Sequence, residues 1–341
     1  MKIKELEKFI AANNLPKYRL QQIVKAIYQE GVILWQEIST LPKDLRVELE
    51  KRIEILSCQP IRMLKADNKS SFKALLKAGD GCVFETVLMR NKPGRWTACI
   101  SCQVGCPIGC VFCATGQGGF KRNLESEEIN DQILLWLNYI KNNFPKEKLN
   151  SIVYMGMGEP FLNWENVKES IKELTNPELF GFGDRSISVS TIGIVDGFKK
   201  LAKDFPQVNL AVSLHCANND KRSELVPIND QYNLTKLRQA INQYISLTNR
   251  KVFLEYVMLA DINDTKEDSG YLVEYVKSFD KPYLLHINLI PYNETKGKFK
   301  MTSQEKADRF KNYLAKNKIS VTIRRSLGRE IKGACGQLAG E

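Results

Sequence analysis

The stretch ACISCQVGCPIGCVFCATG, residues 98–116, holds five of the nine cysteines in the chain. The five are Cys99, Cys102, Cys106, Cys110 and Cys113. The glycines and the proline between them indicate a turning loop rather than a helix or a strand. In a reducing compartment, thiols gathered in this way indicate metal or redox chemistry rather than a disulfide framework.

Length, composition and charge indicate the domain organisation, the compartment and the class of partner. The chain has 341 residues, 43% of them hydrophobic, which suits one large domain with a small accessory one. It contains no apolar run long enough to span a bilayer, and residues 1–14 lack the apolar core of a signal peptide, so we expect a cytoplasmic protein with no membrane contact. The net charge of +11 favours a polyanionic partner such as nucleic acid, although a basic enzyme of another kind fits equally well.

The chain divides into three predicted regions. Residues 1–60 carry apolar side chains at helical spacing over 3–14, 19–29 and 43–56, which predicts a small helical accessory domain. We expect this domain to bind RNA through its basic residues. Residues 61–97 predict a β-hairpin extension that turns at Gly79-Asp80-Gly81. Residues 98–341 alternate strand-like and helical patterns and form the predicted core.

This alternation predicts an α/β fold with a parallel sheet, open or curled into a partial barrel of about six βα units. The strand-like runs after the cysteine loop span residues 151–155, 186–190, 208–214, 251–259 and 284–290. Polar peptides follow several of them: GMGEP, STIG, SLH and PYN. Because parallel strands end at one edge of a sheet, we expect these peptides and the cysteine loop to form a single site.

Three groupings of the cysteines compete. Cys106, Cys110 and Cys113 form C-x3-C-x2-C and could ligate three irons of a [4Fe–4S] cluster. Alternatively, two C-x2-C pairs, Cys99 with Cys102 and Cys110 with Cys113, could bind a structural zinc. The chain would then be a zinc-stabilised RNA-binding protein without catalytic activity. In the third grouping, Cys99 and Cys102 form a redox pair. Phe112 directly before the last cysteine favours the cluster.

With these motifs the chain resembles the radical SAM RNA adenosine methyltransferases of the RlmN/Cfr family. The resemblance covers essentially the whole chain and rests on residues 99–124, YMGMGEPFLNWENV, SVSTIGIV, LAVSLHCANNDKRSELVPIN, VMLADIND, HINLIPYN and the terminal GACGQLAG. It implies a partial (β/α)6 radical SAM barrel that uses a [4Fe–4S] cluster and two molecules of S-adenosylmethionine (SAM) per turnover.

Carried over position by position, the resemblance implies a set of site residues. The cluster ligands are Cys106, Cys110 and Cys113. The residues that hold SAM are Gly158, Glu159, Ser190, Ser213, Leu214, His215 and Asn293. The catalytic residues are the methyl-carrying Cys335, its resolving partner Cys99, and the candidate general base Glu85.

The implied reaction is a ping-pong methylation of carbon 2 of an adenosine. Cys335 is first methylated, a 5′-deoxyadenosyl radical then removes hydrogen from that methyl group, and the carbon radical adds to the ring. A base takes the proton from the adduct, and Cys99 attacks the Cys335 sulfur to release the RNA. The implied partners are 23S rRNA in the peptidyl-transferase region, tRNA beside the anticodon, and an electron donor such as flavodoxin or ferredoxin, with the enzyme a monomer.

Three points stay open at this stage. Glu85 is either an edge-strand carboxylate facing solvent or a site residue. Cys102 stands where the family usually has serine, so it is either a small packed residue or a second resolving thiol. Pro160 and Val104 favour methylation at carbon 2, while other stretches are shared with the relatives that methylate carbon 8 and confer antibiotic resistance.

Overall fold

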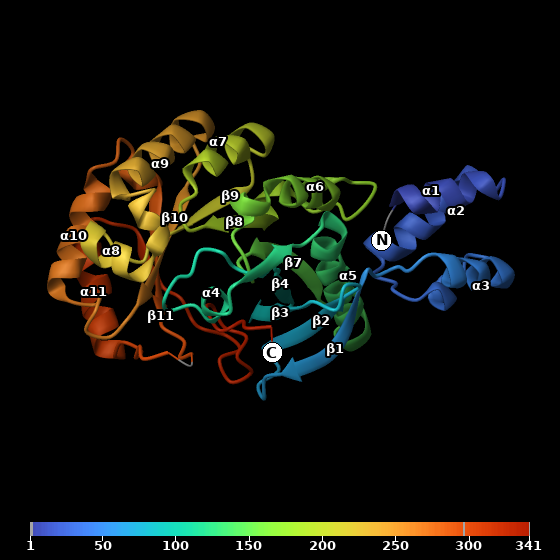
Figure 1. The fold of residues 1–341 in the computed structure, drawn as a ribbon, viewed down its shortest axis with the longest axis horizontal. Helices are drawn as coiled ribbons and strands as arrows, with labels where there is room; N and C mark the ends of the chain where they lie inside the picture. Colours follow the sequence, from blue (N-terminus) through green and yellow to red (C-terminus); the bar gives the residue numbers. More distant parts are fainter. Residues whose placement is uncertain (1–2, 296, 341) are drawn as a thin grey trace.

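The computed structural model describes residues 3–295 and 297–340. Its N-terminal part is helical, as predicted: α1 (Ile3–Ala12), α2 (Lys17–Val24) with a π-helical turn (Lys25–Gln29), and α3 (Lys43–Arg52). These helices pack on fully buried apolar residues such as Leu6, Ile23 and Leu49. They lie together at one end of the molecule, beside the sheet (Figure 1). The third helix ends four residues earlier than the pattern indicated, because the β-branched Ile53 takes an extended conformation.

Four antiparallel strands follow: β1 (Cys58–Lys65), β2 (Ser71–Ala78), β3 (Val83–Lys92) and β4 (Arg95–Cys99). The predicted hairpin is confirmed, since β2 and β3 pair with Leu75 opposite Glu85. The hairpin is also part of the main sheet. The strand β4 pairs antiparallel with β3 on one side and parallel with β7 (Lys148–Tyr154) on the other. The proposed division between residues 97 and 98 therefore falls within β4.

Within the described residues the main sheet has ten strands, in the order β1-β2-β3-β4-β7-β8-β9-β10-β11-β12. From β4 onward the neighbours are parallel and follow chain order, which is the arrangement of a partial barrel. The remaining strands are β8 (Ile187–Thr191), β9 (Asn209–Ser213), β10 (Val252–Met258), β11 (Leu285–Pro291) and β12 (Val321–Ile323). The predicted α/β fold is thereby confirmed.

Helices connect these strands and cover the outside of the curved sheet (Figure 1). They are α5 (Ser126–Asn143), α6 (Trp164–Thr175), α7 (Val195–Asp204), α8 (Asn219–Leu225), α9 (Leu234–Thr248), α10 (Lys266–Lys277) and α11 (Gln304–Lys316). The strands alternate buried and half-buried residues, as β8 shows, with Ile187, Val189 and Thr191 buried. Among the described residues, none of the helices has the length and apolar character needed to span a membrane.

The cysteine loop leaves β4 and runs through a small separate sheet, in which β5 (Gln103–Gly105) pairs with β6 (Phe120–Asn123). The short helix α4 (Ala114–Gln117) lies between these two strands in the chain. Gly105 has a φ of +78°, and a Cβ at this position would collide with the carbonyl oxygen of Gly119. Only glycine therefore allows the two strands to approach so closely.

We expect Gly105→Ala to lower the free energy of unfolding by about 2 kcal/mol or more, because it combines a left-handed backbone with a backbone collision. The matched control is Gly118→Ala, since Gly118 has a φ of −74° and room for a Cβ. That variant should stay within about 0.5 kcal/mol of the parent in denaturant unfolding. Equal losses in the two variants would contradict the role assigned to Gly105.

Candidate active site

A cavity of about 210 Å³ lies at the carboxyl ends of the parallel strands. Its walls come from the strand ends, from the cysteine loop and from the C-terminal segment between residues 324 and 338. Ten of the predicted site residues line it: Cys99, Cys106, Cys110, Cys113, Gly158, Glu159, Ser190, Ser213, His215 and Cys335. The sequence expectation that the strand-end peptides converge on one site is thus met by the geometry.

The three cysteines predicted as cluster ligands share this cavity. Cys106, Cys110 and Cys113 are free thiols in the turning loop that precedes α4. Burial raises the pKa of the Cys106 thiol to about 12, and the pKa of Cys110 is raised for the same reason. A thiol in such surroundings ionises when a cation offsets its charge, so three cysteines that line one cavity fit the donor set of an iron–sulfur cluster.

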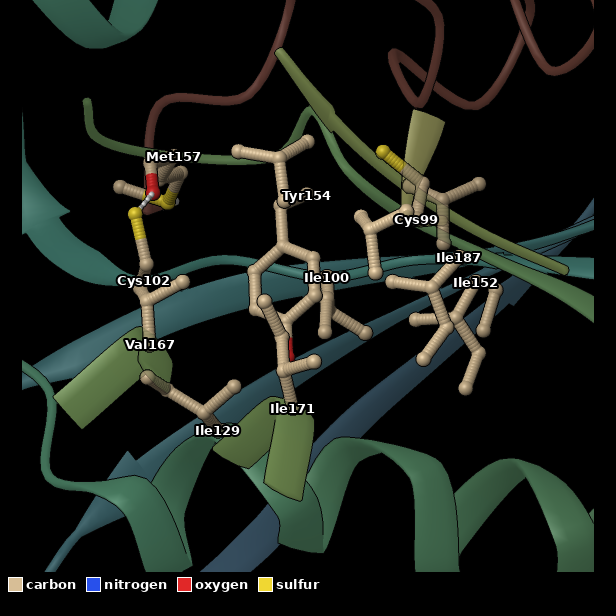
Figure 2. Packing of buried hydrophobic residues seen from close by; sticks show 14 of the residues in the cluster. Cys99, Ile100, Cys102, Ile129, Ile152, Tyr154, Met157, Val167, Ile171 and Ile187 are labelled. Atoms are coloured by element: carbon tan, nitrogen blue, oxygen red, sulfur yellow. Dashed lines mark hydrogen bonds between the residues drawn. The ribbon is translucent and has the colours of Figure 1, made fainter. Parts of the chain in front are cut away.

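Cys102 lies outside the cavity. It is 2% exposed, and its Sγ is 3.7 Å from the carbonyl oxygen of Met157. Figure 2 shows Cys102 and Cys99 on opposite sides of Tyr154. A zinc site built from Cys99, Cys102, Cys110 and Cys113 is therefore wrong. A thioredoxin-like redox pair is wrong as well, because β5, not a helix, begins after Cys102.

Glu159 connects the ends of two neighbouring strands. Its carboxylate accepts hydrogen bonds from the backbone N–H groups of Phe161 (3.1 Å) and Ile192 (2.8 Å), which follow β7 and β8. The residue is 3% exposed, and burial raises the pKa of its carboxyl to about 7. Gly158, with a φ of +102°, packs so closely on Gln103 that a Cβ would not fit. A bound cation would favour the ionised form of this carboxyl, against the effect of its burial.

His215 is held in a neutral form. Its backbone has a φ of +58°, and its Nδ1 accepts a hydrogen bond from the Val257 N–H at 3.2 Å. Burial, together with the charge of Arg222, lowers the pKa of the imidazole to about 3. Its ring contacts Phe112 of the cysteine loop edge-on, with the ring centroids 4.9 Å apart. The imidazole thus joins the end of β9 to the loop.

The remaining predicted cofactor residues divide into two groups. Ser190 and Ser213, on neighbouring strands, face each other across 3.5 Å at the cavity wall. Leu214 and Asn293 do not line the cavity: Leu214 is fully buried, and the Asn293 side chain donates to the carbonyl oxygen of Cys335 at 3.0 Å. The structure thus gives Asn293 a contact with the cysteine segment.

Two ionisable residues of the cavity were not predicted as a pair. Glu255, in the middle of β10, is 2% exposed, and its Oε2 is 3.3 Å from Nη1 of Arg324. A carboxylate inside the apolar run KVFLEYVML was the sequence signal that could have identified it. Arg324 also acts on the two remaining cysteines of the site, since its charge lowers the pKa of both Cys99 and Cys335.

These two cysteines come from opposite ends of the chain. Cys99 is the last residue of β4, and Cys335 lies in the C-terminal segment, exposed as a residue but with its thiol at the cavity wall. Burial raises the pKa of the Cys99 thiol to about 12, partly against the effect of Arg324, and the pKa of Cys335 is raised for the same reason. The guanidinium of Arg324 therefore offsets only part of the effect of burial on these two thiols.

Glu85 is neither exposed nor at a sheet edge. Its strand, β3, lies between β2 and β4, so the edge-strand hypothesis is wrong. The carboxylate is fully buried and 2.5 Å from Nζ of Lys73, and it does not line the cavity.

We expect Arg324→Gln to slow alkylation of Cys99 and Cys335 by iodoacetamide about tenfold, which is the effect of raising a thiol pKa by one unit. The rate for Cys99 should still be rising at about pH 10, since its pKa is about 12. Arg325→Gln is the matched control, because the partner of Glu255 is Arg324. In Arg324→Gln the carboxylate of Glu255 loses its charged partner, and the double variant Arg324→Gln/Glu255→Gln removes that carboxylate as well. Equal slowing in the control would contradict this role.

Comparisons with known proteins agree with the geometry. Residues 100–269 match the radical SAM superfamily, and residues 1–55 match the ribosomal RNA large subunit methyltransferase N-terminal domain. A ribosomal RNA large subunit methyltransferase Cfr from Clostridium botulinum is 42% identical over 339 residues, which cover 99% of this chain and 96% of the relative.

Two further relatives also span the full length. A probable dual-specificity RNA methyltransferase RlmN from Chlorobium phaeobacteroides is 40% identical, with 98% of this chain and 93% of the relative covered. The crystal structure of a radical SAM methyltransferase from Sphaerobacter thermophilus superposes with a TM-score of 0.92 at 39% identity, covering 100% of this chain and 98% of that one. The chain therefore belongs to the RlmN/Cfr family of radical SAM ribosomal RNA methyltransferases, which use a [4Fe–4S] cluster and S-adenosylmethionine.

Proposed function

We propose that this enzyme methylates carbon 2 of an adenosine in the peptidyl-transferase region of 23S rRNA, and of an adenosine beside the anticodon of tRNA, as a cytoplasmic monomer. The observation that carries the proposal is the meeting of Cys99 and Cys335 at one cavity with the three cysteines of the C-x3-C-x2-C loop. The net charge of +11 suits an RNA substrate.

In this proposal Cys106, Cys110 and Cys113 hold the cluster. Glu159 would hold the ammonium group of SAM, and Gly158, Ser190, Ser213 and His215 would line the rest of its site. When bound, the cluster and SAM supply the methyl group and the radical chemistry of the family. The neutral imidazole of His215 would add no positive charge to a site that takes the cationic SAM.

The two remaining cysteines carry and release the methyl group. Cys335 gives up its proton, accepts a methyl group on sulfur and presents it to the RNA, with Arg324 stabilising the thiolate. After the new carbon–carbon bond has formed, the Cys99 thiolate attacks the Cys335 sulfur. The bond between that sulfur and the transferred carbon breaks, and its electron pair stays with the carbon side. The transferred carbon takes up a proton to complete the methyl group, and a Cys99–Cys335 disulfide remains. A flavodoxin or ferredoxin is the proposed electron donor.

The base that removes the ring proton in this scheme is Glu85. In the present arrangement its carboxylate accepts hydrogen bonds from the N–H groups of Ala339 and Gly340. A proton transfer to Glu85 therefore requires these two residues to move away first.

The choice of carbon 2 is supported by Pro160 and Val104. Pro160 begins a short 3-10 helix directly after Glu159, and Val104 is buried in β5 beside the cysteine loop. Both residues resemble the branch that methylates carbon 2. Methylation at carbon 8 is the second candidate, since several full-length relatives carry the name Cfr.

We expect 2-methyladenosine when the reconstituted enzyme, SAM, a reductant and a 23S rRNA fragment react without oxygen and the RNA is digested for mass spectrometry. An 8-methyladenosine product would overturn the assignment to carbon 2. A tRNA substrate assayed in parallel tests the second part of the proposal.

We also expect Cys99→Ala to leave the RNA covalently attached to Cys335, because the resolving thiol is missing. The matched variant Cys102→Ser should turn over like the parent, since Cys102 is packed under Met157 and away from the cavity. Denaturing gels of labelled RNA distinguish the adduct from free product. Full release of RNA by Cys99→Ala would contradict the role assigned to Cys99.

A further inference from the structure

A buried ion pair lies in the hairpin that precedes the cysteine loop. Nζ of Lys73 is 2.5 Å from Oε1 of Glu85, and their side chains are only 6% and 1% exposed. In the register of β2 and β3, Lys73 faces Val87 while Leu75 faces Glu85, so the two charges are diagonal neighbours on one face of the hairpin. Two charges withdrawn from water in this way need further hydrogen bonds to be tolerated.

Among the described residues, the further hydrogen bonds of the two charged groups go to the C-terminal segment. Oε2 of Glu85 accepts from the backbone N–H groups of Ala339 at 2.7 Å and Gly340 at 3.1 Å. Nζ of Lys73 donates to the carbonyl oxygen of Lys332 at 3.3 Å. One ion pair therefore holds both ends of the stretch from residue 332 to residue 340, and Cys335 lies between those ends.

The stretch has little internal structure that could hold it in place. It contains no helix or strand, and it turns at left-handed residues, with φ of +51° at Lys332, +82° at Gly336 and +74° at Gly340. Between its ends, Ala114 and Thr115 of α4 bind the carbonyl oxygens of Gly336 and Leu338. The position of such a segment depends on contacts from other parts of the chain.

We propose that the Lys73–Glu85 pair is a positioning element that ties down both ends of residues 332–340 and so holds the thiol of Cys335 at the cavity wall that also contains Cys99. The inference deepens the proposed methyl-carrier function and rests on it. Before the ring proton is transferred, Lys73 and Glu85 act through the backbone of the carrier segment, and release of Ala339 and Gly340 then frees Glu85 to act as the base. Lys73 thereby gains a role that no motif in its sequence neighbourhood indicated.

The first test measures the segment itself, by hydrogen–deuterium exchange of the full chain without cofactors. Lys73→Met and Glu85→Gln should raise exchange in peptides covering residues 328–340 about tenfold. Peptides from β8 to β11 should not change, which separates release of the segment from general unfolding. Lys77→Met is the matched control, because Lys77 is an exposed lysine on the same strand and face. Unchanged exchange in the folded variants would overturn the proposal.

The second test measures where the release leaves Cys335. Diamide, a two-electron oxidant, should join the thiols of Cys99 and Cys335 into a disulfide at equal rates in the parent and Lys77→Met, as followed by mass spectrometry. The rate should fall about tenfold in Lys73→Met, because the thiols meet less often. It should fall similarly in a chain that ends at Leu338, which lacks both N–H donors but keeps the ion pair.

Different results would contradict the positioning role of the Lys73–Glu85 pair and the proposed roles of Cys335 and Cys99. Equal oxidation rates in all variants would overturn the positioning role and leave the methyl-carrier proposal intact. A different result would overturn the resolving role of Cys99 and leave the positioning role of the Lys73–Glu85 pair intact. In that result the parent protein never forms the Cys99–Cys335 disulfide, but Lys73→Met still releases the segment.

Discussion

The architecture depends on the double pairing of β4. This strand pairs antiparallel with β3 and parallel with β7, and so joins an antiparallel hairpin extension to a parallel barrel in one continuous sheet. Its last residue, Cys99, faces Val153 in the register with β7. Because the cysteine loop begins there, the same pairing brings that loop, the hairpin with Glu85 and the ends of the barrel strands to one edge.

Burial dominates the electrostatics of the cavity. It raises the pKa of Cys99, Cys106 and Glu159, and it lowers that of His215, so burial disfavours the charged form of each of these groups. Arg324 is a cation in contact with this set, and Glu255 partly offsets it. In the proposed function, the irons of the cluster would offset the charge of the cysteine thiolates, and the ammonium of SAM would offset that of Glu159.

The C-terminal segment differs physically from the barrel that it covers. The barrel strands are held by continuous backbone ladders, whereas residues 332–340 are held by individual contacts from Lys73, Glu85, Thr115 and Asn293. In the proposed reaction, Cys335 meets SAM, RNA and Cys99 in succession and has to move between positions. A few separable hydrogen bonds permit such motion, while a ladder of strand pairing would prevent it.

The sequence by itself determined the elements and most of the site. Helical and alternating periodicities gave the strands and helices, and the peptides after each strand identified residues that meet at one edge, since parallel strands end together. The burial of Cys102, the pairing of Glu255 with Arg324, and the contact of Lys73 and Glu85 with residues 332–340 were decided only by the tertiary structure. Each depends on which side chains from distant parts of the chain the folded sheet brings together. No local sequence pattern encodes which distant residues will be in contact.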